Sequence, residues 1–94
     1  MTPEGRVKAR VRKVLGDIGA FYSMPMTGGF GNSGDPDFLI CHNGRFFGIE
    51  CKAKGNKPTA LQLKRLDDIR KAGGVALVID ETNVETLRKE LNHE

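Results

Sequence analysis

The sequence predicts an α/β domain in which a mixed β-sheet is flanked by helices. Three segments have apolar residues every three or four positions, as amphipathic helices do, and four shorter segments have the apolar character of strands. These segments follow one another in the order α-β-β-β-α-β-α. The strand–helix–strand unit between positions 46 and 79 favours a right-handed crossover, which makes its two strands parallel. Helices on both faces of a mixed sheet are expected from this order.

All 94 residues, 1–94, are predicted to form one domain, because a single hydrophobic core commonly spans about 50–200 residues. The sequence has no apolar run of about 18 residues, the length that predicts a transmembrane helix. It also lacks the apolar N-terminal segment of a secretory signal. Its two cysteines have no metal-site spacing. We therefore expect a cytoplasmic protein with no membrane partner.

The first helix is predicted to begin after Thr2, because Thr is a favourable N-cap and Pro3 suits the first helical position. Gly16 and Gly19 bracket its C-terminal end. The apolar stripe of this helix consists of Val7, Val11, Val14, Leu15 and Ile18.

A short strand at 20–24 and a loop at 25–34 are predicted next. The loop contains four glycines, which favour irregular backbone. Phe30 near its centre either inserts into a branched substrate or closes over a functional site, or it packs locally, and the sequence leaves these interpretations open.

Positions 38–41 and 46–53 are predicted to pair as a β-hairpin. Asn43 and Gly44 lie between these two apolar runs, and an Asn-Gly pair favours a two-residue type I′ turn. With this turn, the sequence numbers of every two paired residues add up to 87.

This register places Asp37 directly opposite Glu50. Opposite side chains lie on the same face, with Cβ atoms roughly 4.5–5.5 Å apart. Lys52 shares that face, because side chains alternate along a strand. Two like charges in this position destabilise a sheet, so a structural role explains the pair poorly. A divalent cation between the carboxylates removes the repulsion, and Mg²⁺ typically takes one or two carboxylates together with waters.

The C-terminal part is predicted to continue with a helix, a strand and a second helix. Thr59 with Gln62 is a capping-box pattern for a helix that runs to about position 72, before two glycines. Positions 75–79 are continuously apolar, as in a buried parallel strand. Thr82 with Glu85 is another capping-box pattern, and the last helix has an apolar face made by Val84, Leu87 and Leu91.

Two polar residues on the apolar helix stripes extend the candidate site. Glu4 lies three positions before Val7, and Gln62 lies four positions before Leu66. Buried polar groups need partners, and a metal with its waters is a candidate partner for both. Each also has a purely structural interpretation: Glu4 as a first-turn acid and Gln62 as a capping residue.

These residues together resemble a known family. In chain order they are Glu4, Gly34-Asp35-Pro36-Asp37, Glu50-Cys51-Lys52 and Gln62. The set is similar to the VRR-NUC family in its stand-alone form, the virus-type replication-repair branch of the PD-(D/E)XK nuclease superfamily. The resemblance covers nearly the whole chain, from position 4 to about position 79. It implies a restriction-endonuclease-like (PD-(D/E)XK) core.

The resemblance also implies a role for each residue in a metal-dependent DNA endonuclease. Asp37 and Glu50 would bind Mg²⁺ or Mn²⁺, with the backbone carbonyl of Cys51 as a further ligand. Lys52 would orient or deprotonate the attacking water, or stabilise charge on the phosphate. Glu4 and Gln62 would hold metal-bound waters or align the catalytic lysine.

Charge is distributed unevenly along the chain. Positions 1–65 carry eleven Lys or Arg against five Asp or Glu, whereas positions 66–94 carry four against seven. Basic clusters attract the phosphate backbone of DNA without reading its sequence. The candidate DNA contacts are Arg6, Lys8, Arg10, Arg12, Lys13, Lys54, Lys57, Lys64 and Arg65.

The resemblance to stand-alone family members implies a homodimer that cuts branched DNA, such as four-way (Holliday) junctions, in replication, recombination or DNA repair. A bacterial or phage-infected cell is the expected setting. Two alternatives stay open. One is a nuclease that nicks duplex DNA or cuts flaps, and the other is a DNA-binding module whose catalytic site is vestigial.

Overall fold

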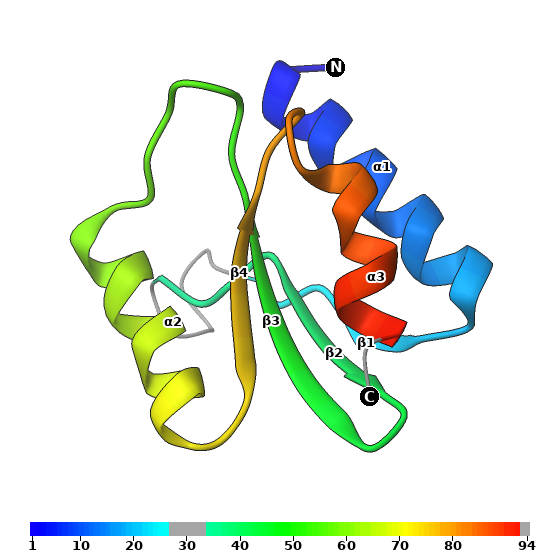
Figure 1. Ribbon diagram of the computed structural model, residues 1–94. Helices are drawn as coiled ribbons and strands as arrows, with labels where there is room; N and C mark the ends of the chain where they lie inside the picture. The colour runs from blue at the N-terminus through cyan, green and yellow to red at the C-terminus, as the bar shows by residue number, and fades with distance from the viewer. Residues whose placement is uncertain (27–33, 93–94) are drawn as a thin grey trace.

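The computed structural model describes residues 1–26 and 34–92, and Phe30 lies outside the described residues. Helices cover both faces of a mixed β-sheet, which confirms the predicted α/β class (Figure 1). The elements are α1 (Pro3–Ile18), β1 (Phe21–Ser23), β2 (Phe38–His42), β3 (Arg45–Cys51), α2 (Ala60–Lys71), β4 (Val75–Ile79), the short 3₁₀ helix η1 (Val84–Thr86) and α3 (Leu87–Asn92). Their order agrees with the predicted order α-β-β-β-α-β-α.

The described strands form one sheet in the order β1-β2-β3-β4. The first two neighbouring pairs are antiparallel, whereas β3 and β4 are parallel and joined through α2. The hairpin register is the predicted one, because His42 pairs with Arg45 and Phe38 pairs with Ile49. The turn residues Asn43 and Gly44 have φ angles of 52° and 76°. Positive φ at both positions is what a type I′ turn requires.

The hydrophobic core lies between one face of the sheet and the helices α1 and α3, while α2 covers part of the other face (Figure 1). Alternation along β3 sends Phe47, Ile49 and Cys51 into this core. The predicted stripe of α1 packs there as well. Burial of these side chains is the main force that holds helices and sheet together. The fully buried core residues include Val7, Val11, Leu15, Phe38, Phe47, Ile49, Cys51, Val84, Leu87 and Leu91.

On the other face, α2 approaches the sheet closely. Its capping box is formed as predicted. The Thr59 hydroxyl accepts a hydrogen bond from the backbone N–H of Gln62, and the Gln62 side-chain oxygen accepts one from the backbone N–H of Thr59. Leu66 is the buried contact residue of this helix. Gly34 packs against the backbone of Leu61 in the first turn, so the segment that leads into β2 is held directly on α2.

The predicted capping box of the last helix is wrong. The carboxylate of Asp80 accepts hydrogen bonds from both the backbone N–H and the hydroxyl of Thr82, so this threonine does not cap a helix. Glu85 instead forms an ion pair with Arg10 of α1, with a nitrogen–oxygen distance of 2.8 Å. The chain therefore makes a turn and the short helix η1 before α3 begins at Leu87.

None of the helices in the described part of the chain has the length and apolar character needed to cross a membrane.

Replacing Gly34 with Ala is expected to destabilise the fold more than replacing Gly44 with Ala. Both glycines have positive φ, which costs an alanine on the order of 1 kcal/mol. A Cβ at position 34 would also lie 3.0 Å from backbone atoms of Leu61, whereas a Cβ at position 44 would meet nothing within 4 Å. Overpacking of this kind costs a further amount of about 1–3 kcal/mol. Urea unfolding of both variants measures the difference, and equal losses would contradict the close contact.

Candidate active site

The hairpin brings two carboxylates to one end of the sheet. Asp37 immediately precedes β2 and Glu50 is the penultimate residue of β3, so continuing the register places them opposite each other. The backbone N–H of Cys51 donates a hydrogen bond of 2.8 Å to Asp37 Oδ2. This bond orients the aspartate across the end of β3 and leaves its other oxygen, Oδ1, to face the neighbouring charges.

Glu50 is a buried charged residue with an unsatisfied oxygen. Its side chain is only 3% exposed. Oε2 lies 3.6 Å from Lys52 Nζ, whereas Oε1 is buried and has no hydrogen-bond partner among the described residues. A buried carboxylate oxygen without a donor is costly and uncommon in folded proteins. A cation or a water held by a cation would satisfy it, so the site fits a bound metal.

The environment makes Glu50 a weak acid. Burial, followed by the nearby negative charge of Asp37, raises the pKa of Glu50 to about 7, although the Lys52 ammonium acts in the opposite direction. Near neutral pH the carboxyl is therefore close to the midpoint of its titration. Any cation that binds beside it favours the ionised form.

Lys52 lies one residue beyond β3, and its backbone is still hydrogen-bonded to the neighbouring strand β4. Its backbone N–H donates to the carbonyl of Ile79 at 2.9 Å. Its ammonium lies between two carboxylates, 3.6 Å from Glu50 Oε2 and 3.8 Å from Glu4 Oε1. The side chain is only 14% exposed, so these attractions are weakly screened by solvent. The two acids and the lysine thus lie at the same end of the hairpin, as predicted from the register.

Helix α1 adds two further charged groups, because its first turns lie near the C-terminal end of β3 (Figure 1). Glu4 contacts Lys52 as described. Lys8, one helical turn later, lies 3.4 Å from Asp37 Oδ1 and 3.8 Å from Glu4 Oε2. Partial burial acts to lower the pKa of Lys8, but the attraction of Asp37 and Glu4 outweighs it, and the pKa lies above its ordinary value. Lys8 is therefore a cation of this site.

The sequence-based interpretation assigned Lys8 only to a DNA-contacting surface. The signal that could have placed it at the carboxylates is its spacing from Glu4, since residues four apart lie on the same face of a helix.

Gln62 is engaged elsewhere in this structure. Its side-chain oxygen Oε1 accepts from the backbone N–H of Thr59 at 2.9 Å, as part of the capping box. This contact is the structural role that the sequence left open. A role for Gln62 at the metal stays a prediction, as does ligation by the backbone carbonyl of Cys51. The Cys51 thiol itself is buried, and burial raises its pKa, so it remains a neutral packing group.

The donor set suits a hard cation that keeps much of its water. Within residues 1–26 and 34–92, no three side chains of His, Cys, Asp or Glu converge as a ready-made metal cage. Asp37 and Glu50 provide two carboxylates, and Mg²⁺ or Mn²⁺ is commonly bound by one or two carboxylates with waters and substrate phosphate filling the remaining positions.

The other predicted DNA contacts fall into two groups. In the first, the side chains form ion pairs with carboxylates: Arg10 with Glu85, Lys13 with Asp17, Lys64 with Asp68, and Arg65 with Asp35 and Asp68. In the second, the side chains belong to exposed residues and make no ion pair in the described part of the chain: Arg6, Arg12, Lys54 and Lys57. Contact of either group with DNA stays a prediction.

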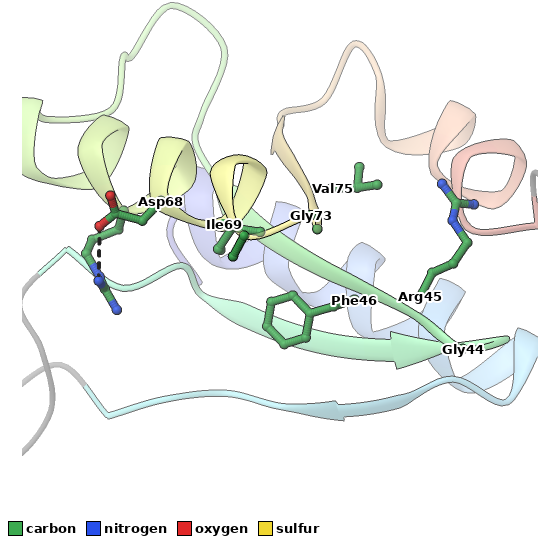
Figure 2. A pocket seen from close by; sticks show the side chains of 10 residues that line it. Gly44, Arg45, Phe46, Asp68, Ile69, Gly73 and Val75 are labelled. Atoms are coloured by element: carbon green, nitrogen blue, oxygen red, sulfur yellow. Dashed lines mark hydrogen bonds and ion pairs between the residues drawn. The ribbon is translucent and has the colours of Figure 1, made fainter.

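A hollow of about 500 Å³ lies at the opposite end of β3, between the hairpin turn and the C-terminal half of α2 (Figure 2). Phe46 and Ile69 line it, with Gly73 and Val75 at its side. Neither Asp37 nor Glu50 lines this hollow. It is therefore separate from the carboxylate site.

Comparisons with known proteins bear on the fold and the family of this chain. No model of a known protein family matches the chain. A protein named "Putative nuclease p44" from Acyrthosiphon pisum secondary endosymbiont phage 1 is 31% identical over 90 residues, which cover 95% of this chain and 90% of that protein. A solved structure described as a VRR_NUC domain superposes with a TM-score of 0.79 at 24% identity and covers 100% of both chains.

The structural match confirms the predicted fold, and the phage nuclease is similar over nearly its full length. This chain belongs to the family of that phage protein, and its fold is that of a VRR-NUC domain with a PD-(D/E)XK-like core.

Proposed function

We propose that this protein is a metal-dependent DNA endonuclease that hydrolyses phosphodiester bonds at the site formed by Asp37, Glu50 and Lys52. The observation that carries the proposal is the pair of facing carboxylates, one of them buried with an oxygen that has no partner among residues 1–26 and 34–92. Nothing in the core requires this pair, and its mutual repulsion is costly without a cation.

Each side chain has a distinct task in this proposal. Asp37 and Glu50 would hold Mg²⁺ or Mn²⁺ at the end of β3. When bound, the cation supplies Lewis acidity for the phosphoryl group and acidifies the attacking water. Lys52, held between Glu50 and Glu4, would orient that water or neutralise charge that develops on the phosphate. Glu4 would keep the ammonium in place.

Exposed basic residues on the segments that also carry site residues support DNA as the substrate. Arg6 and Arg12 lie on α1, and Lys54 and Lys57 lie on the loop that follows the catalytic lysine. Such residues would contact phosphates and position the duplex without selecting a sequence. The relative from a phage is named a nuclease, which agrees with this proposal.

We further propose that the substrate is branched DNA and that the protein acts as a homodimer. A two-fold dimer would present two identical sites, one for each strand of a four-way junction. An exposed apolar strip on the sheet supports self-association: Phe21, Cys41 and Phe46 lie side by side in the register of β1, β2 and β3. Phe21 is 74% exposed and Phe46 is 44% exposed, which is unfavourable for an isolated chain in water.

Cleavage of a labelled four-way junction and of the matching linear duplex tests the nuclease directly. With Mg²⁺ or Mn²⁺, the parent protein is expected to make paired symmetric cuts in the junction. Asp37→Asn is expected to slow cleavage by roughly a hundredfold or more, because metal-assisted stabilisation of the transition state amounts to several kcal/mol.

Lys71→Met is a matched control for loss of a charge on an exposed helix, and it should cut as the parent does. Equal cutting of junction and duplex would favour the nicking or flap alternative. DNA binding without any metal-dependent cutting would favour the non-catalytic module, and undiminished cutting by Glu50→Ala would refute the assigned site.

Metal is expected to raise thermal stability, and more strongly at pH 8 than at pH 5.5. In the absence of metal, the folded protein binds the Glu50 proton more tightly than the unfolded chain does, because the pKa is about 7 rather than 4.5. Stability attributable to Glu50 is therefore lost as pH rises between these values, by at most about 3 kcal/mol. A cation offsets this loss. Melting temperatures in EDTA and in Mg²⁺ measure both effects.

In that experiment Glu50→Gln removes the titrating group and should flatten the pH dependence between 4.5 and 7. A parent protein whose melting temperature is indifferent to millimolar Mn²⁺ at pH 8 would count against the shared carboxylate site.

Phe21→Ser is expected to weaken the proposed dimer without lowering the stability of the monomer, because the ring is mostly exposed in the isolated chain. Sedimentation velocity over a range of protein concentrations measures the association. A parent protein that stays monomeric at all concentrations would overturn the dimer, and a variant that associates as the parent does would exclude this strip as its interface.

A further inference from the structure

We propose that Lys8 is a positioning residue that sets the charge of the site, so that a divalent cation binds weakly until a DNA phosphate is present. This inference rests on the proposed metal-dependent nuclease function. It assigns Lys8 a role distinct from that of Lys52 and from that of the exposed basic residues on the same helix.

The first argument is the oxygen that Lys8 contacts. Asp37 Oδ2 already accepts a hydrogen bond of 2.8 Å from the backbone N–H of Cys51, whereas Oδ1 accepts none from the backbone and is the more available oxygen for a cation. Lys8 Nζ lies 3.4 Å from that Oδ1. The lysine therefore supplies positive charge at the oxygen that a metal ion would use.

The second argument is that the two lysines share one carboxylate. Glu4 Oε2 lies 3.8 Å from Lys8, and Glu4 Oε1 lies 3.8 Å from Lys52. Glu4 thus links the two ammonium groups, and each of them also contacts one of the two facing acids. A Glu–Lys pair four residues apart contributes little to an exposed helix. The helix itself therefore does not explain why this lysine reaches the site.

The third argument is the balance of charge. When all groups are ionised, three carboxylates and two ammonium groups give the site a net charge of −1. A divalent cation changes this to +1, and one phosphodiester then makes it neutral. Without Lys8 the site would carry −2, become neutral with the cation alone, and become negative again with the phosphate. The lysine thus disfavours the cation alone and favours the cation together with DNA.

The test compares Lys8→Met with the parent in two binding measurements. Free Mn²⁺ is titrated by electron paramagnetic resonance in the absence of DNA. A labelled four-way junction is titrated by fluorescence anisotropy in EDTA, so that no cleavage occurs. Methionine keeps an unbranched side chain that is one atom shorter, and it removes the charge.

Lys8→Met is expected to bind Mn²⁺ about tenfold more tightly than the parent, because a like charge next to the metal is removed. It is expected to bind the junction about threefold more weakly in EDTA, because the site becomes more negative. Lys71→Met is the matched control. Lys71 also pairs with a carboxylate four residues away, at 3.0 Å from Asp67, but its side chain is 76% exposed and lies on α2. It should leave the Mn²⁺ affinity unchanged.

Opposite changes in the two affinities separate this role from a structural one, since a damaged site would lose affinity for both ligands. Weaker or unchanged Mn²⁺ binding by Lys8→Met, with a circular dichroism melt showing a folded protein, would overturn the inference alone. The double variant Lys8→Met with Asp37→Asn tests the metal site itself. If Mn²⁺ binding does not depend on Asp37, both the proposed metal site and this inference are wrong.

Discussion

The two-residue turn at Asn43 and Gly44 determines where the two facing acids of the site, Asp37 and Glu50, lie. Both residues adopt positive φ, which closes the hairpin with its strands in one register only. A shift of one residue would send Asp37 and Glu50 to opposite faces, because side chains alternate along a strand. The hydrogen bond from the Cys51 backbone to Asp37 also depends on this register. A turn at one end of the hairpin thus controls the chemistry at the other.

This arrangement destabilises the fold, because it buries a carboxylate away from water. Glu50 is buried beside another acid, and one of its oxygens has no partner within the described chain. A hydrophobic residue at this position would stabilise the isolated fold. The surrounding core compensates for the penalty, since α1 and α3 bury a continuous apolar cluster against the sheet. The site is therefore maintained by packing that lies on the opposite face of the same strands.

Much of the fold was predictable because it depends on local rules. Asn43-Gly44 predicted the hairpin, and the Thr59 capping box predicted the start of α2, with each outcome set by a few neighbouring residues. The Thr82 pattern failed because Asp80, two positions earlier, accepts the Thr82 backbone N–H that the Glu85 side chain would accept in a capping box. Sequence spacing predicts that a cap can form, but it does not rank competing acceptors.

The site was predictable where it follows the hairpin and less so where it depends on tertiary contacts. Asp37, Glu50 and Lys52 are related by strand alternation, which the sequence displays. Lys8 reaches Asp37 only because α1 packs with its first turns near the end of β3. That placement comes from the packing of the whole core, whereas the spacing from Glu4 indicates only that the two side chains share one face of α1.

The backbone and the side chain of Cys51 have different roles. The N–H of Cys51 orients Asp37, while its side chain is fully buried in the core. The same division runs along β3, where Phe47, Ile49 and Cys51 face the core and Glu50 belongs to the site. Substitutions on the core side of this strand are therefore expected to act on the site through stability, whereas substitutions at Glu50 act on its charge directly. A single strand thus carries the packing and one of the charged groups, and a core change that shifts its backbone would move both Glu50 and the N–H that orients Asp37.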